Sequence, residues 1–211
     1  MIISHEYKFI FIKTRKTAGS TFEALMYPHL NKETDICTGS PRDGTPSLNS
    51  PTTNGHATYA EAVKYAGDVD LGEYQTFTIE RNPWDKMVSA YWWHYHTKSE
   101  WKEWVEDFDA YMFCPYVPKD FYKYHLDPND WTSIVNVVYD YDDLAGMYED
   151  MDTFFGIKIP ESDWRGTKLK SGIRKSGHYS ELHNDYTREC VEKMFAEEIE
   201  MMGYTYEQRS S

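Results

Sequence analysis

The stretch YKFIFIKTRKTAGST at residues 7–21 carries three local signals in succession. Residues 7–12 form a compact run of aromatic and β-branched side chains, which predicts a buried strand. Residues 13–21 are rich in basic and hydroxyl side chains and predict a turn. Apolar residues at helical spacing follow, and Pro28 marks the end of that helix. The chain therefore opens with a strand, a basic turn and a helix.

The rest of the chain continues to alternate strands with helices. Further strands are predicted at 74–80 and 134–139, and helices at 57–66, 84–95, 101–125, 144–155 and 186–202. This order indicates an α/β fold with a mainly parallel central sheet flanked by helices. We expect a single domain over residues 1–211, with a long flexible loop at 37–55 that is composed mostly of Gly, Pro, Ser, Thr and Asn.

Composition excludes several classes of protein. A net charge of -13 argues against a general nucleic-acid binder and against adhesion to an anionic membrane. The three cysteines, Cys37, Cys114 and Cys190, have no metal-ligand spacing and suggest a reducing compartment. The sequence shows no signal peptide and no apolar run long enough to span a membrane. We therefore expect a cytoplasmic protein.

The turn at residues 13–21 gathers groups that can hold a multiply charged oxyanion. A helix N-terminus offers unpaired N–H groups and about half a positive charge. Lys16 adds an ammonium group, and Gly19 allows the backbone to approach a ligand closely. Hydroxyl groups come from Thr17, Ser20 and Thr21. The spacing differs from the Walker loop, which disfavours ATP or GTP. The alternative is an ordinary helix start with incidental polar residues.

A second candidate site begins at Arg81, at the end of the predicted strand 74–80. Asn82 and Pro83 form a typical helix start. A guanidinium group at a strand end can hold a phosphate through two hydrogen bonds, and Ser89 in the helix can add another. The alternative is an ion pair between Arg81 and a local carboxylate such as Asp85.

Together, the two segments resemble the PAPS-dependent sulfotransferases, which use 3′-phosphoadenosine 5′-phosphosulfate (PAPS) as sulfuryl donor. Residues 9–21 are similar to that family's 5′-phosphosulfate loop, and FTIERNPWDKMVSAY at 77–91 is similar to its 3′-phosphate motif. The acidic end of the strand at 137–144 and the closing helix at 186–204 resemble the carbohydrate-type branch. The resemblance implies a P-loop-like three-layer sandwich, with the nucleotide lying across both motifs and adenosine 3′,5′-bisphosphate (PAP) as product.

The resemblance also assigns residues to the two ends of the donor. It implies that Arg81 and Ser89 hold the 3′-phosphate, and that Lys170 and Arg174 belong to a loosely matching segment over the adenosine. The implied 5′-phosphosulfate contacts are Arg15, Lys16, Thr17, Ala18, Gly19, Ser20 and Thr21. The chain departs from the family at Glu80, which is usually apolar, and at Arg15, where many relatives carry Pro.

In-line sulfuryl transfer needs positive charge and N–H donors aimed at the leaving phosphate oxygen. Lys16 is the catalytic candidate for that role. His56, placed where the predicted loop meets a helix, is the candidate general base, and the carbohydrate-type relatives carry a comparable histidine. Glu80 is the alternative base. The alternative to a catalytic role is, for His56, an ordinary surface histidine and, for Glu80, an ion pair with Arg81. The reaction requires no metal.

The expected acceptor is a hydroxyl group of a carbohydrate or another small molecule. The aromatic residues at 91–95 supply either a stacking surface for a sugar or ordinary core packing. The acidic net charge disfavours a polyanionic acceptor. Two other functions stay open: a P-loop small-molecule kinase, and a nucleotide-binding module without turnover.

Overall fold

The computed structural model describes residues 1–39, 44–97, 107–124, 135–167, 169 and 172–208. The chain divides into two compact units. Unit 1 comprises residues 1–80 and 122–169, and unit 2 comprises residues 81–121 and 170–211. The single domain expected over residues 1–211 stays a prediction.

Unit 1 contains a five-stranded sheet in the order β3-β1-β2-β4-β5. Its strands are β1 (Ile2–Ser4), β2 (Phe9–Ile12), β3 (Ile36–Cys37), β4 (Gln75–Glu80) and β5 (Val137–Asp140). The neighbours β2, β4 and β5 are parallel, whereas β1 is antiparallel to both β2 and β3. Four of these five strands therefore run in one direction. The sequence predicted β2, β4 and β5 but missed β1 and β3, which are too short to show a clear pattern.

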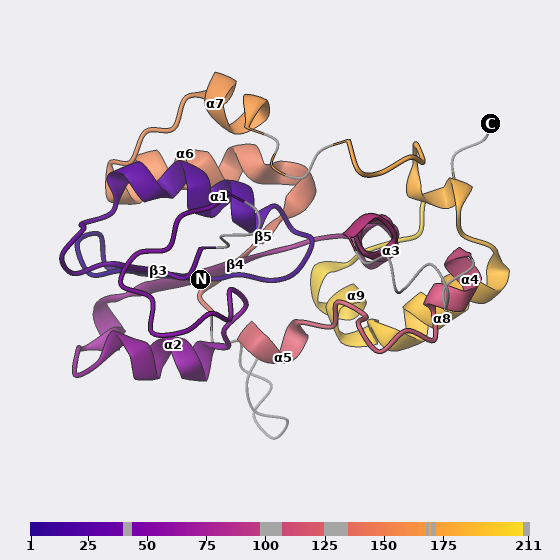
Figure 1. Cartoon of the computed structure of the whole chain (residues 1–211), viewed down its shortest axis with the longest axis horizontal. Helices are drawn as coiled ribbons and strands as arrows, with labels where there is room; N and C mark the ends of the chain where they lie inside the picture. Colours follow the sequence, from indigo (N-terminus) through magenta and orange to yellow (C-terminus); the bar gives the residue numbers. More distant parts are fainter. Residues whose placement is uncertain (40–43, 98–106, 125–134, 168, 170–171, 209–211) are drawn as a thin grey trace. The chain divides into compact units, whose positions relative to one another are not determined.

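Helices cover both faces of the sheet. In Figure 1, α1 (Gly19–Met26) and α6 (Leu144–Phe155) lie over one face, and α2 (Tyr59–Ala66) lies over the other. This arrangement confirms a mixed α/β unit with a helix-flanked sheet, while its P-loop-like character stays a prediction. The remaining elements of residues 1–80 and 121–169 are α5 (Phe121–Tyr124), α7 (Glu161–Gly166), η1 (Tyr27–His29), η3 (Leu71–Glu73) and η5 (Tyr141–Asp143).

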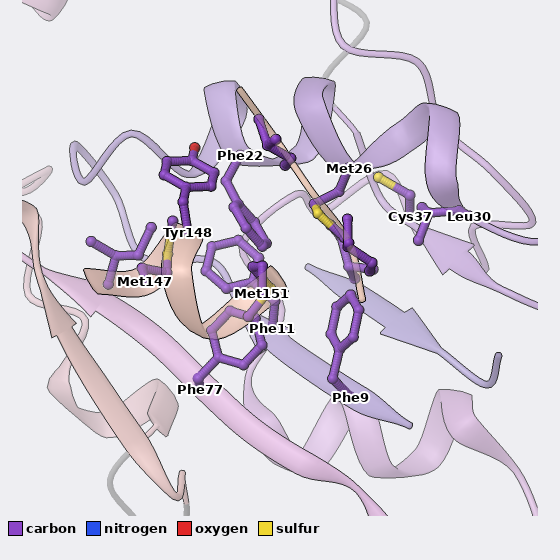
Figure 2. Close-up of a cluster of buried hydrophobic side chains, with 14 residues drawn as sticks. Phe9, Phe11, Phe22, Met26, Leu30, Cys37, Phe77, Met147, Tyr148 and Met151 are labelled. Carbon is purple, nitrogen blue, oxygen red and sulfur yellow. The ribbon is translucent and has the colours of Figure 1, made fainter. Parts of the chain in front are cut away.

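An aromatic and methionine core joins the sheet to α1 and α6 (Figure 2). Phe11 and Phe77 project from β2 and β4 and pack around Phe22 of α1. The ring centroids of Phe11 and Phe22 lie 4.6 Å apart. Met147 and Met151 of α6 complete the cluster, and all five side chains are buried. Burial of each contributes about 1.5–3 kcal/mol. The core therefore holds both ends of the turn between β2 and α1 in place.

The predicted loop at 37–55 contains ordered pairings at its start. Cys37 pairs with Ile2 in the sheet and forms an isolated bridge with Leu48. Residues 40–43 of this segment lie outside the described residues. The flexibility expected of the loop stays a prediction.

Unit 2 is helical in its described residues. Its elements are α3 (Pro83–Thr97), α4 (Phe108–Tyr111), η6 (Tyr179–Glu181), α8 (Asp185–Met194) and α9 (Ala196–Met202). Tyr91 belongs to the core of this unit, and Trp92 and Tyr95 pack against it, which favours core packing for these aromatics. The continuous helix predicted at 186–202 is wrong, because Phe195 (φ −121°, ψ 28°) separates α8 from α9.

The helix predicted at 101–125 falls partly on residues 101–106 and 125, which lie outside the described residues. The described part contains two short helices, α4 and α5, instead of one continuous helix. No helix in the described ranges is long and apolar enough to cross a membrane.

Candidate functional site

The turn between β2 and α1 is tied to the sheet by buried threonines. The Thr14 hydroxyl donates a hydrogen bond of 2.6 Å to the carbonyl of Ile79 in β4. The Thr17 hydroxyl lies 2.8 Å from the Thr14 hydroxyl and 3.2 Å from the Thr14 carbonyl. Thr17 therefore stabilises the turn from within, and the phosphosulfate contact predicted for it stays a prediction.

Two residues of the turn have an unusual backbone conformation. Lys16 has a φ of 67° and Ala18 a φ of 63°, both in the left-handed region that L residues rarely adopt. Such conformations cost about 1–3 kcal/mol each and cluster at ligand-binding turns. Partly buried Arg15 and Lys16 carry the positive charge of this turn.

The start of α1 suits an anion. The N-cap residue Ala18 makes no side-chain capping bond, and the first turn contains no acidic residue. Ser20 and Thr21, both buried, lie in that first turn. Because the first N–H groups of any α-helix lack partners within the helix, this end of α1 can donate to an oxyanion.

Lys13 packs across the start of α1. Its Nζ lies 2.6 Å from Oε2 of Glu23, and both side chains are almost fully buried. A Cβ atom built on Gly19 would lie only 2.7 Å from Cγ of Lys13. The group that packs closely against Gly19 is therefore the Lys13 side chain. Contact between Gly19 and a ligand stays a prediction. The sequence signals this pair only weakly, through a lysine that directly follows a buried strand.

The structure brings His56 to the same turn. Its Nδ1 lies 3.1 Å from the carbonyl oxygen of Lys13, and its backbone N–H donates to Oδ1 of Asn54. Because a carbonyl can only accept, Nδ1 carries the proton in this contact, which makes Nε2 the basic nitrogen of the neutral ring. α2 begins after this residue, capped by Thr58. His56 thus has the tautomer that a general base requires at Nε2.

The structure gives Glu80 a tyrosine partner that the sequence did not indicate. It is fully buried at the end of β4, and its Oε2 accepts a hydrogen bond of 2.8 Å from the Tyr124 hydroxyl. The sequence predicted a base or an ion pair with Arg81 and did not identify Tyr124. Complete burial against a tyrosine favours His56 over Glu80 as the base.

In unit 2, Arg81 forms the ion pair with Asp85 that the sequence offers as the alternative to phosphate binding. Nε and Nη2 of Arg81 lie 2.7 and 2.5 Å from Oδ2 of Asp85. Nη1 of Arg174 lies 2.5 Å from Oδ1 of the same carboxylate. Burial alone would raise the pKa of Asp85, but the charge of Arg81 and the hydrogen bond and charge of Arg174 outweigh it, so this pKa lies below its usual value.

Further contacts hold Arg174. Its Nη2 donates to the carbonyl of Gly177, and its Nε lies 3.2 Å from the hydroxyl oxygen of Ser176. That hydroxyl also accepts a hydrogen bond from the indole N–H of Trp92 in α3. Ser89 lies on α3 four residues after Asp85 and therefore on the same face. Lys170 lies outside the described residues.

The predicted helix start at Asn82 is confirmed, since its side-chain oxygen accepts from the N–H of Trp84. Lys16 belongs to unit 1 and Arg81 to unit 2. That both hold one nucleotide stays a prediction.

The described residues contain no cluster of His, Cys, Asp or Glu able to hold a metal ion.

A sequence model of the sulfotransferase family matches residues 1–205, a range that includes the turn between β2 and α1 and the start of α3 after Arg81. No curated protein matches the chain.

Proposed function

The chain belongs to the sulfotransferase family, and we propose that it moves a sulfuryl group from PAPS to a hydroxyl group of a carbohydrate or another small acceptor. Family membership supports sulfuryl transfer in general. The main support for PAPS as the sulfuryl donor is the turn between β2 and α1. There, a helix start without a side-chain cap adjoins Arg15 and Lys16. The N–H groups of the helix start and these two basic side chains suit an anionic ligand better than a neutral one.

The two ends of the donor would be held separately. Lys16 and the N–H groups at the start of α1 would bind the 5′-phosphosulfate. Arg81 and Ser89 would bind the 3′-phosphate, since a guanidinium group matches the geometry of phosphate oxygens. PAPS supplies the activated sulfuryl group; the protein supplies its orientation and charge.

The residues of unit 1 can then assist each part of an in-line transfer. His56 accepts the acceptor's hydroxyl proton at Nε2 as the acceptor oxygen forms its bond to sulfur. Lys16 stabilises the negative charge that grows on the 5′-phosphate oxygen as the sulfur–oxygen bond breaks. The bond's electron pair leaves with that phosphate oxygen, so that PAP and a sulfate ester are the products.

Thermal unfolding with nucleotides tests the donor class. A ligand at one hundred times its Kd stabilises a protein by about 2.7 kcal/mol. We expect PAP to raise the Tm by several degrees and ATP with magnesium to leave it nearly unchanged. The reverse result would favour a phosphate-transferring enzyme and contradict the proposal.

Turnover separates an enzyme from a binding module. PAP formation from PAPS in the presence of a panel of sugars should require Lys16, because its positive charge is lost in Lys16→Ala. The matched control Lys158→Ala removes an exposed lysine that follows α6 and should keep full activity. Binding of PAP without turnover on any acceptor would indicate a non-catalytic module instead.

A further inference from the structure

We propose that Asp85 is a positioning residue of the 3′-phosphate site, where its carboxylate holds the guanidinium groups of Arg81 and Arg174 so that both contact one phosphate. This inference rests on the proposed function, because the ligand is the bisphosphate nucleotide. It assigns a role to Asp85 and joins Arg174 to the same phosphate as Arg81.

The geometry of the carboxylate supports this role. Asp85 uses its two oxygens for two different arginines: Oδ2 contacts Arg81 and Oδ1 contacts Arg174. The contact with Arg81 runs through its Nε and Nη2 atoms. Arg81 and Arg174 lie 93 positions apart in the sequence, and both contact this one carboxylate.

Charge explains why a carboxylate is needed between the two arginines. Two guanidinium groups this close would repel each other, and Arg81 is largely buried, which strengthens the repulsion. One carboxylate leaves the cluster with one net positive charge. A cluster of this charge can still attract a phosphate dianion, and it is stable before the ligand arrives.

The surroundings limit the movement of both arginines. Arg174 is also held by Ser176 and by the carbonyl of Gly177. Asp85 lies in the first turn of α3, an element anchored in the core of unit 2 by Trp84 and Met87. Groups fixed before binding lose less conformational entropy when the ligand binds, which raises affinity.

Two possible roles of Asp85, compensation of positive charge and positioning of the arginines, predict opposite changes in nucleotide affinity for the Asp85→Asn variant. If Asp85 only offsets positive charge, its removal strengthens the binding of an anion. If it positions the arginines, its removal weakens binding in spite of the added net positive charge. The sign of the change in affinity therefore separates the two roles.

Calorimetric titration with PAP and with adenosine 5′-monophosphate measures this sign. For Asp85→Asn we expect the Kd for PAP to rise roughly tenfold, the size of one charge-assisted hydrogen bond. The Kd for the monophosphate, which lacks the 3′-phosphate, should change less than about twofold. Equal or tighter PAP binding by the variant would overturn the role of Asp85.

Asp185→Asn is the matched control, since Asp185 is an exposed aspartate of unit 2 that pairs with Arg188. It should bind both nucleotides as the unchanged protein does. If the unchanged protein fails to bind PAP, the proposed function itself fails, which is a different outcome from normal binding by Asp85→Asn.

A double variant tests the connection to Arg174. Because Asp85 acts partly through Arg174, the loss in Asp85→Asn combined with Arg174→Ala should be smaller than the sum of the two single losses. Full additivity would contradict that connection. Should Asp85→Asn fail to fold, Asp85→Glu keeps the charge but displaces it, and an unchanged ratio of PAP to monophosphate affinity would then overturn the proposal.

Discussion

His56 shows that a side chain's chemistry depends on which of its atoms is already bonded. Its Nδ1 is bonded to the carbonyl of Lys13, so the turn that carries Lys16 also sets the tautomer of the ring. The contact joins residues 43 positions apart. A side chain fixed in this way loses little conformational freedom when a ligand binds beside it.

Replacement of His56 by Ala should separate catalysis from binding. We expect kcat to fall by about 10²- to 10⁴-fold, the usual contribution of a general base, with little change in the Kd for PAP. Steady-state kinetics and PAP titration on the same preparation measure both quantities. His29→Ala removes an exposed histidine of η1 and should leave both unchanged. An unchanged kcat in His56→Ala would remove His56 from the base role.

His183 should make stability depend on pH. Burial lowers its pKa from 6.5 to about 4, although its Nε2 is bonded to the carbonyl of Trp84. Between these two values the unfolded chain takes up a proton that the folded chain does not. The free energy of unfolding should therefore fall as the pH drops from 6.5 toward 4, by at most about 1.4 kcal/mol per pH unit.

Urea unfolding at a series of pH values measures this dependence. His183→Gln removes the titrating group, so its stability should vary less with pH across the same window. His29→Gln, at an exposed position, should keep the original dependence. An equal pH dependence in His183→Gln would show that other groups cause the effect.

At the scale of the element, the turn between β2 and α1 depends on a glycine for packing. Gly19 is the first residue of α1, and Lys13 lies across it with its ammonium group paired to Glu23. An added methyl group would force the buried lysine to move. The close packing at this position therefore fixes how the turn leaves the strand.

Gly19→Ala should lower the free energy of unfolding by about 1–3 kcal/mol, the usual cost of overpacking. Gly146→Ala, in the first turn of α6, is the matched control, because its nearest contact would be an ordinary 3.5 Å to Asp143. That change should be neutral or stabilise by up to about 1 kcal/mol, since Ala favours helices. Denaturant unfolding of both variants measures the difference; equal stabilities would contradict the role of Lys13.

At the scale of the whole molecule, the proposal requires both units to contact one nucleotide. Hydrogen exchange monitored by mass spectrometry can test this requirement. PAP should slow exchange both at the start of α1 in unit 1 and at the start of α3 in unit 2. Adenosine 5′-monophosphate, which lacks the 3′-phosphate, should protect the first region much more than the second. Protection by PAP in one unit alone would contradict a shared nucleotide.

The sequence by itself determined the elements on either side of the two candidate sites, namely the turn between β2 and α1 and the junction between β4 and α3. The strands β2, β4 and β5, the helix α1 and the start of α3 were predicted because their signals are local: apolar runs, helical spacing and an Asn-Pro helix start. The first residues of α1, 19–21, were predicted as part of the preceding turn. Family membership followed from the same segments. Elements with weak local signals were missed, namely the short β1 and β3 and the break between α8 and α9 at Phe195.

Only the tertiary structure decided which side chains meet. Arg174 contacts Asp85 across 89 positions, and the hydroxyl of Tyr124 reaches Glu80 across 44. A hydrogen bond or an ion pair depends on distance and direction, and spacing along the chain gives neither for residues on different elements. The sequence named Lys16, His56 and Arg81 as candidates. The fold then placed His56 on the turn of Lys16, buried Glu80 beside a tyrosine, and joined two arginines through one carboxylate.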